Sequence, residues 1–343
     1  MKKLLNTLYI TQPDVYLALD GETVIAKRDD EVLLRIPLHN LEGIVSFGYT
    51  GASPALMGAC AERGVALTFL SMNGRFLASI TGLEHGNVLL RKTQYRISDR
   101  EGDSLAIARN ILIGKLHNSR WVLERAVRDH ALRLDAERVR SSARMISDDI
   151  TLLRNAESLG QLRGIEGEAA SRYFSVFDEL ILQNKELFVF TGRNRRPPLD
   201  RVNALLSFIY TLLSHDVAAA LSTTGLDPFV GFLHRDRPGR RSLAFDLMEE
   251  LRAPLADRFV LTMINNRQID PSDFLIKETG AVVMKDIARR TLLTAWQERK
   301  QDQIVHPFLK EKISWGLVPH AQSLLLARHL RGDLDEYPPF LWK

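Results

Sequence analysis

The sequence predicts an α+β fold in two domains, a small N-terminal β domain followed by a larger all-α C-terminal domain. Up to about residue 80, short segments rich in β-branched and aromatic residues alternate with turn-forming residues, which is typical of β-strands. From about residue 100, the apolar residues follow the three-and-four spacing of amphipathic helices. A chain of 343 residues is long enough for two domains that each bury a core. We place these domains at 1–95 and 96–343.

Six strands and one helix are expected in the N-terminal domain. Asp20-Gly21 and Asp29-Asp30 form turns between early strands, and Asn73-Gly74 predicts a hairpin between the last two. Ser53-Pro54 has the residue types of an N-cap and a first helical residue, and Gly64 is a stop signal, so a helix lies between them. The strands are expected at 6–10, 15–19, 23–26, 32–36, 66–70 and 76–80.

The C-terminal domain is expected to contain helices only. Leu105, Ile111, Leu112 and Leu116 share one helical face, and the apolar pattern continues as far as Val127. Loops rich in glycine, proline and arginine separate the later helices. Helical patterns recur at 151–185, 201–221, 242–252, 285–299 and 318–331.

The composition is that of a globular protein, with 45% hydrophobic and 26% charged residues, which excludes a disordered or fibrous chain. The apolar runs are far shorter than the ~20 residues that a membrane-spanning helix needs. The N-terminal segment becomes polar too soon for a signal peptide. A single cysteine, Cys60, excludes an internal disulfide framework and a cysteine-based zinc cluster. We therefore expect a soluble, cytoplasmic protein with no membrane partner.

Eight arginines gather in two loops, although the net charge of the whole chain is only +4. The planar guanidinium matches phosphate oxygens, and clusters of arginine bind phosphodiester backbones. Asp200 and Asp236 lie among them, so ordinary surface ion pairs are the alternative interpretation. The eight candidates for nucleic-acid binding are Arg193, Arg195, Arg196, Arg201, Arg235, Arg237, Arg240 and Arg241.

Glu166 stands between two glycines, Gly164 and Gly167, inside a helical pattern. A glycine there destabilises a helix by about 1 kcal/mol relative to alanine, and it allows a ligand or another backbone to approach closely. The alternative is a solvated glutamate at a helix junction, which this segment alone favours.

Three further polar residues are candidates for metal ligation. His234 ends an apolar segment just before a turn, and neutral imidazole is a good ligand for borderline divalent metals. Asp246 and Glu249 are three residues apart on one helix face, where two carboxylates repel each other unless a cation or a proton lies between them. Taken singly, each segment favours the structural alternative, a hydrogen-bonded structural histidine for His234 and a charged solvent face for Asp246 and Glu249.

Taken together and in order, four segments resemble the CRISPR-associated adaptation integrase/endonuclease ("Cas-one") family of spacer acquisition. The resemblance spans nearly the whole chain and includes the family's layout of a β domain followed by a helical domain. The segments are Gly164–Phe174, Asn203–Tyr210, Gly231–His234 and Ser242–Glu249.

The resemblance implies a divalent-metal-dependent DNA integrase whose cofactor is Mg²⁺ or Mn²⁺. Its metal ligands map onto Glu166, His234 and Glu249, and these residues together with Asp246 are the implied catalytic residues. Many members have aspartate at the third position, so either Asp246 or Glu249 is the direct ligand. The implied reaction is transesterification, in which the 3′-hydroxyl of a short DNA fragment attacks a phosphodiester of the CRISPR repeat.

The resemblance also implies the partners. These are double-stranded DNA (the prespacer and the CRISPR repeat), a second copy of the chain in a homodimer formed largely through the β domain, and a small second adaptation protein in a heterohexamer-type complex. The two arginine loops would hold backbone phosphates without specifying sequence. Tyr173 shares the helix face of Glu166 and either orients the DNA end or packs in the core.

Two other functions stay open at this point, a metal-dependent nuclease that hydrolyses DNA and a non-catalytic DNA-binding scaffold. A C-terminal segment rich in aromatics and proline, Tyr337–Trp342, is either a docking tail or folded back on the helical domain.

Overall fold

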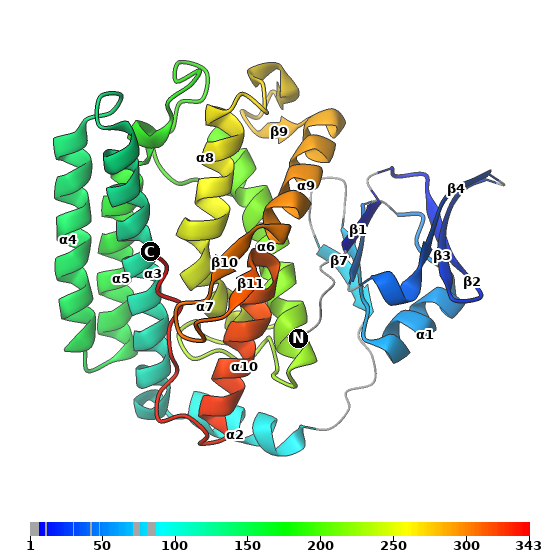
Figure 1. Cartoon of the computed structure of the whole chain (residues 1–343), viewed down its shortest axis with the longest axis horizontal. Coiled ribbons are helices and arrows are strands. Elements are labelled where there is room, and N and C mark those ends of the chain that lie inside the picture. The colour runs from blue at the N-terminus through cyan, green and yellow to red at the C-terminus, as the bar shows by residue number, and fades with distance from the viewer. Residues whose placement is uncertain are drawn as a thin grey trace. The chain divides into compact units, whose positions relative to one another are not determined.

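The computed structural model describes residues 7–343 except 11, 30, 42, 48, 71–75 and 81–86. The chain divides into two compact units (Figure 1). The first comprises Met1–Gly86 and Arg289–Gln301, and the second comprises Asn87–Ala288 and Asp302–Lys343. The division thus lies slightly before the boundary that we placed at residue 95. The predicted fold class is confirmed, because strands make up most of the N-terminal region and helices most of the rest.

The first unit contains two sheets and one helix from the N-terminal region. A four-stranded sheet has the order β1-β5-β6-β7, with β1, β5 and β6 parallel and β7 antiparallel to β6. A three-stranded antiparallel sheet has the order β2-β3-β4. The elements are β1 (Thr7–Ile10), β2 (Tyr16–Asp20), β3 (Thr23–Arg28), β4 (Glu31–Pro37), β5 (Gly43–Phe47), α1 (Pro54–Arg63), β6 (Ala66–Leu70) and β7 (Phe76–Ile80).

The six predicted strands and the predicted helix are all confirmed. The Ser53 side chain accepts a hydrogen bond from the Leu56 backbone, and Gly64 ends α1 in the left-handed conformation at φ +66°. The Asn73-Gly74 turn lies outside the described residues, but β6 and β7 pair as a hairpin requires. The prediction missed β5, a short strand that lies between two strands of the same sheet.

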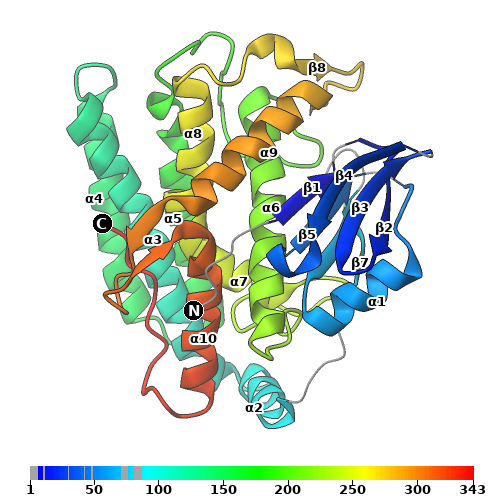
Figure 2. The ribbon, with the colours of Figure 1, turned by 45° about the vertical axis from the view of Figure 1, so that its right-hand side comes forward.

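The second unit is built around a long helix, α3 (Glu101–His130). Helices α4 and α5 lie beside α3 in both views of the ribbon (Figures 1 and 2). The other helices are α2 (Val88–Ser98), α4 (Ala136–Arg154), α5 (Leu159–Ser175), α6 (Arg201–Thr223), α7 (Ser242–Leu251), α8 (Arg258–Asn265) and α10 (Val318–Leu330). Helix α9 (Asp286–Gln301) begins in this unit, but its residues Arg289–Gln301 are assigned to the first unit.

Three details of the helical region differ from the prediction. The region is mostly helical rather than all-α, because it also contains two small antiparallel sheets. The pattern at 151–185 is divided, because Ser158 caps α5 and α4 ends before it. Helices α2, α4 and α8 were not predicted as separate helices. The short strands are β8 (Phe274–Ile276), β9 (Val282–Met284), β10 (Gln303–Val305) and β11 (Lys312–Ser314).

Helix α6 is the most apolar long helix of the second unit. This helix is long and apolar enough to cross a membrane, but 61% of its most apolar 18-residue stretch is buried in the structure. Such burial is typical of the core helix of a globular protein.

The C-terminal segment folds back on the helical unit, which decides between our two interpretations. Asn118 of α3 donates to the Phe340 carbonyl at 2.7 Å and accepts from the Trp342 backbone at 2.8 Å. The buried carboxyl group of Glu250 on α7 accepts from the Phe340 backbone at 2.8 Å and from Gln322 at 2.9 Å. The tail therefore braces the helix that carries Glu249.

Candidate metal and nucleic-acid site

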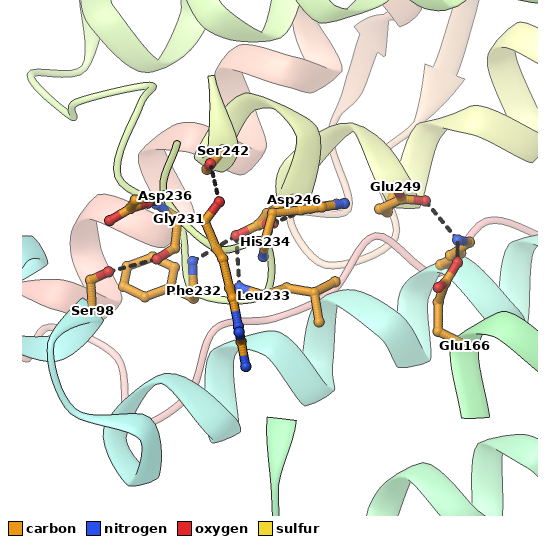
Figure 3. A network of polar contacts seen from close by, with 12 residues as sticks. Ser98, Glu166, Gly231, Phe232, Leu233, His234, Asp236, Ser242, Asp246 and Glu249 are labelled. Carbon is orange, nitrogen blue, oxygen red and sulfur yellow. Dashed lines mark hydrogen bonds and ion pairs between the residues drawn. The ribbon is translucent and has the colours of Figure 1, made fainter. Parts of the chain in front are cut away.

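Two of the predicted ligands, Glu166 and Glu249, converge on one cation, the ammonium of Lys115. Helix α5 supplies Glu166, α7 supplies Glu249 and α3 supplies Lys115. Lys115 Nζ forms an ion pair with Glu166 Oε1 and another, at 2.8 Å, with Glu249 Oε2 (Figure 3). Two carboxylates from distant segments thus face a single positive charge, as their mutual repulsion requires.

This cluster is largely withdrawn from solvent. The Glu249 side chain is 4% exposed, that of Lys115 11% and that of Glu166 28%, so Glu166 forms its open side. A Cβ at Gly164 or Gly167 would meet nothing within 4 Å, so the flanking glycines do not serve close packing here. They leave the surroundings of Glu166 open.

Charge holds the cluster in its ionised form. Burial alone would raise the pKa of Glu249, but the charges of Arg252 and Lys115 outweigh burial and lower this pKa to about 2. Burial alone would likewise lower the pKa of Lys115, but Glu249 and Glu166 raise it above its ordinary value. Arg252 Nη2 lies 3.1 Å from Glu249 Oε1. Glu249 is therefore held as an anion and Lys115 as a cation, with Arg252 as a second cation beside them.

His234 belongs to a separate pair with Asp246. Its Nδ1 lies 2.6 Å from Asp246 Oδ1, and its backbone N–H donates to the same oxygen at 3.0 Å. The backbones of Phe232 and Leu233 donate to Oδ2 at 2.7 and 2.9 Å. A Cβ at Gly231 would lie 2.8 Å from Oδ2, so only glycine fits there. An ionised carboxylate only accepts, so Nδ1 carries a proton, and in the neutral imidazole Nε2 then holds the lone pair.

In the structure, Asp246 holds His234 and its neighbouring backbone rather than facing the Glu166–Glu249 pair. Its side chain is fully buried and both oxygens already accept two bonds each, so it holds His234 and leaves Glu249 as the candidate third ligand. Among the described residues, no group of three His, Cys, Asp or Glu side chains lies close enough to hold a metal ion. Figure 3 shows the His234 pair and the Glu166–Glu249 pair as two neighbouring groups.

The donor chemistry nevertheless fits a divalent cation. Glu166 and Glu249 offer hard carboxylate oxygens on either side of a point already occupied by a cation. Within the described part of the chain, Glu249 Oε2 is buried with no hydrogen-bond partner beyond its ion pair with Lys115. His234 Nε2 keeps a lone pair in a fixed tautomer. Lys115 thus holds the carboxylates of Glu166 and Glu249 together, and Asp246 fixes the orientation of the neighbouring His234 imidazole.

Sequence reasoning missed Lys115 and Arg252. Lys115 interrupts the apolar face that Leu112 and Leu116 share on α3, and a charged residue inside such a face is the signal that was available. Arg252 follows Glu249 by three residues, which places the two side chains together on one helix face. Arg252 begins a π-helical turn, Arg252–Asp257, that joins α7 to α8.

Four of the eight arginines are half-buried and bound to the protein itself. Arg193 Nη1 donates to the Asn194 carbonyl at 2.7 Å, and its guanidinium stacks on Tyr210. Arg201 Nη1 donates to the Leu187 carbonyl at 2.8 Å. The other two are Arg240, which stacks on Phe245, and Arg241, whose Nη1 lies 2.8 Å from His215 Nδ1.

The other four, Arg195, Arg196, Arg235 and Arg237, are exposed. Burial lowers the pKa of Arg240, and the charges of Arg237, Arg195 and Arg196 lower it further, so the two loops share one positive environment. No ion pair forms at the four exposed arginines within the described residues. The two loop aspartates do not neutralise them: Asp200 caps α6, and Asp236 accepts from the Gly231 backbone at 3.3 Å.

Tyr173 packs in the core, which decides between its two interpretations and corrects its prediction as a DNA-binding residue. It is 4% exposed and contacts Phe174 and Phe177 edge-on. Its hydroxyl donates to Asp257 at 3.1 Å, and the Tyr210 hydroxyl donates to the same carboxylate at 2.6 Å. Burial raises the pKa of Asp257 to about 6, although these two bonds lower it.

A small cavity joins this network to Lys115 and Glu166. Lys115 and Glu166 line one part of it, and Tyr173, Tyr210 and Asp257 line another. Lys115 and Glu166 therefore border a space that has the buried acid Asp257 in its wall.

Comparison with known proteins identifies the family. The family model described as CRISPR associated protein Cas1 matches residues 8–298. A relative from Chlorobaculum tepidum, "CRISPR-associated endonuclease Cas1 1", is 53% identical over 343 residues, which is 100% of both chains.

Two solved structures have the same fold. A casposase bound to integration product has a TM-score of 0.84 at 22% identity, covering 98% of this chain and 93% of its own. A chain of a Cas6-RT-Cas1–Cas2 complex has a TM-score of 0.82 at 25% identity, covering 100% of this chain and 36% of its own. The matches in sequence span the whole chain, and this protein belongs to the Cas1 family of CRISPR-associated proteins.

Proposed function

We propose that this Cas1 protein is an Mg²⁺- or Mn²⁺-dependent endonuclease and integrase of CRISPR adaptation, which joins the 3′-hydroxyl ends of short DNA fragments to the CRISPR repeat by transesterification. The endonuclease relative, 53% identical over its full length, supports an enzyme that acts on DNA. The observation that carries the proposal is the convergence of Glu166 and Glu249 on one cation beside an oriented histidine.

In this proposal Glu166, Glu249 and His234 hold the metal, with His234 using Nε2. The bound ion would supply Lewis-acid stabilisation of the charge that develops on the phosphoryl and leaving oxygens. Asp246 keeps the imidazole proton on Nδ1, so that the Nε2 lone pair stays free. The burial of Glu249 keeps water away from its carboxylate and strengthens its interaction with a cation.

The exposed arginines would bring DNA to the carboxylate pair. Arg195 and Arg196 from one loop, and Arg235 and Arg237 from the other, offer guanidinium groups that the described residues leave unpaired. Contacts of this kind hold phosphates and give binding that weakens with salt, without reading the base sequence. Double-stranded DNA, as the incoming fragment and as the repeat, is the substrate class that they fit.

Two protein partners are part of the proposal. The likeness to a chain of a Cas6-RT-Cas1–Cas2 complex supports Cas2 as the small second adaptation protein. A homodimer through the β domain is supported by β4, an edge strand with three consecutive apolar residues, Val32, Leu33 and Leu34, each 38% exposed. An exposed apolar edge strand favours pairing with another chain.

A joining assay tests the proposed function. A labelled double-stranded fragment with free 3′-hydroxyls is incubated with a repeat-bearing plasmid, Cas2 and Mn²⁺. Wild type is compared with Glu166→Gln, with His234→Ala and with Glu168→Gln, an exposed glutamate on the same helix as a matched control. We expect Glu166→Gln and His234→Ala to lose joining by about 100-fold or more, and Glu168→Gln to retain it.

The same assay separates the competing functions. Label in the plasmid indicates joining, whereas shortened fragments without plasmid label indicate hydrolysis. Joining at the wild-type rate by both Glu166→Gln and His234→Ala would leave a non-catalytic scaffold as the better interpretation.

A further inference from the structure

We propose that Lys115 is an internal cation that occupies the divalent-metal position between Glu166 and Glu249, and that the metal must displace its ammonium in order to bind. This inference rests on the proposed metal-dependent function and adds a residue that controls loading of the site.

The placement of Lys115 is the first argument. Its side chain rises from α3 between buried leucines and reaches both candidate ligands, although these lie on two other helices. A lysine is seldom buried to this extent unless it is paired. Here the pairing uses the same oxygen atoms that a metal would need, so the ammonium and a metal ion cannot both be bound by them in this arrangement.

The charge of the cluster is the second argument. Lys115 and Arg252 already balance Glu166 and Glu249, so the cluster is neutral in this structure. Adding a divalent ion beside both cations would leave two uncompensated positive charges in a buried site, which is strongly unfavourable. Withdrawal of one ammonium restores part of the balance. Arg252 is bound to the far oxygen of Glu249, Oε1, so Lys115 is the cation in the way.

The adjoining cavity is the third argument, because it gives the displaced ammonium somewhere to go. Lys115 lines this cavity, and the Asp257 carboxylate lies in its wall together with the hydroxyl-bearing residues Tyr173 and Tyr210. A lysine that leaves Glu166 and Glu249 therefore still finds a buried acid nearby. In the absence of metal, the same ammonium keeps the two carboxylates together in spite of their repulsion.

The inference predicts that removing the ammonium tightens metal binding. Mn²⁺ binding is measured by isothermal titration calorimetry on the intact chain at fixed pH and salt. We expect the dissociation constant for Lys115→Met to fall by about tenfold or more relative to wild type, as expected when one of two mutually exclusive cations is removed. Lys115→Arg retains a competing cation and should bind Mn²⁺ no more tightly than wild type.

Two further variants make the result specific. Lys185→Met removes an exposed lysine that pairs with Asp178 and Glu179, and it should leave the Mn²⁺ affinity unchanged. Glu249→Gln removes a candidate ligand and should abolish binding at this site.

The outcomes separate the inference from the proposed function. If Lys115→Met and wild type bind Mn²⁺ equally well while Glu249→Gln does not bind, the metal site stands and the role of Lys115 is overturned. If no variant binds Mn²⁺, both are overturned. If Lys115→Met is unfolded without metal, Lys115→Gln is used instead, and the rise in melting temperature on adding Mn²⁺ is measured. A larger rise for Lys115→Gln than for wild type supports the inference. An equal or smaller rise overturns it.

Discussion

Replacing Asp246 with asparagine tests how the site orients its histidine. The carboxylate accepts from Phe232 and Leu233 through Oδ2, and from the backbone and the ring of His234 through Oδ1. Asparagine keeps one oxygen, which can retain the first two bonds. Its amide nitrogen then faces two donors of His234, where an acceptor is needed.

The effect on stability follows from those two lost bonds. Each hydrogen bond to a charged group contributes about 1.5–3 kcal/mol. The imidazole can re-form one bond by moving its proton to Nε2, so that Nδ1 accepts from the amide. We therefore expect the free energy of unfolding to fall by about 2–3 kcal/mol, with the fold retained.

The effect on activity is larger, because a proton on Nε2 removes the lone pair that would bind metal. We expect joining by Asp246→Asn to fall by about 100-fold or more. Urea unfolding measures the stability, long-range ¹H–¹⁵N NMR of the imidazole reports the tautomer, and the joining assay reports activity. Asp236→Asn is the matched control, because Asp236 is exposed and holds a single backbone bond at 3.3 Å. Joining at the wild-type rate, or a proton that stays on Nδ1, would refute the reasoning.

Two other predictions concern DNA binding and the buried acid of α7. Replacing both Arg195 and Arg196 with alanine should weaken DNA binding and reduce the slope of log affinity against log salt by about 2, measured by fluorescence anisotropy; an unchanged slope would contradict phosphate contacts there. Burial raises the pKa of Glu250 from 4.5 to about 8, so the folded state binds a proton that the unfolded state releases above pH 4.5. Protonation of Glu250 therefore contributes fully to the free energy of unfolding below pH 4.5, and this contribution is lost as pH rises toward 8. The loss is on the order of 4 kcal/mol. Glu250→Gln should not show this loss. Urea unfolding at pH 5 and pH 8 checks this, and parallel pH profiles for variant and wild type would contradict it.

The sequence predicted elements whose boundaries are marked by local chemistry. Helix α1 is an example, because Ser53 caps it and Gly64 adopts the left-handed conformation that ends it. Strand β5 was missed because it is short and its identity depends on pairing with β1 and β6. The sequence also could not decide whether the C-terminal segment docks elsewhere or folds back. The contacts that hold it come from Asn118 and Glu250, which lie on helices distant in the sequence.

The sequence offered candidate ligands for the site but no sign of its counter-ions. The family resemblance pointed to Glu166, His234 and Glu249, whereas no spacing rule connects them to Lys115 on another helix. Sequence spacing also could not show which arginines are bound within the fold and which are exposed. Arg193 and Arg195 are two residues apart, yet the first is bound within the fold and the second is exposed.

The most direct test of the central claim is an anomalous difference map from crystals of the wild-type protein soaked in MnCl₂. The account predicts one peak bounded by the carboxylates of Glu166 and Glu249 and by Nε2 of His234, with the Lys115 ammonium moved away from them. A map with Lys115 still between the two carboxylates and no peak beside them at saturating Mn²⁺ would contradict the account.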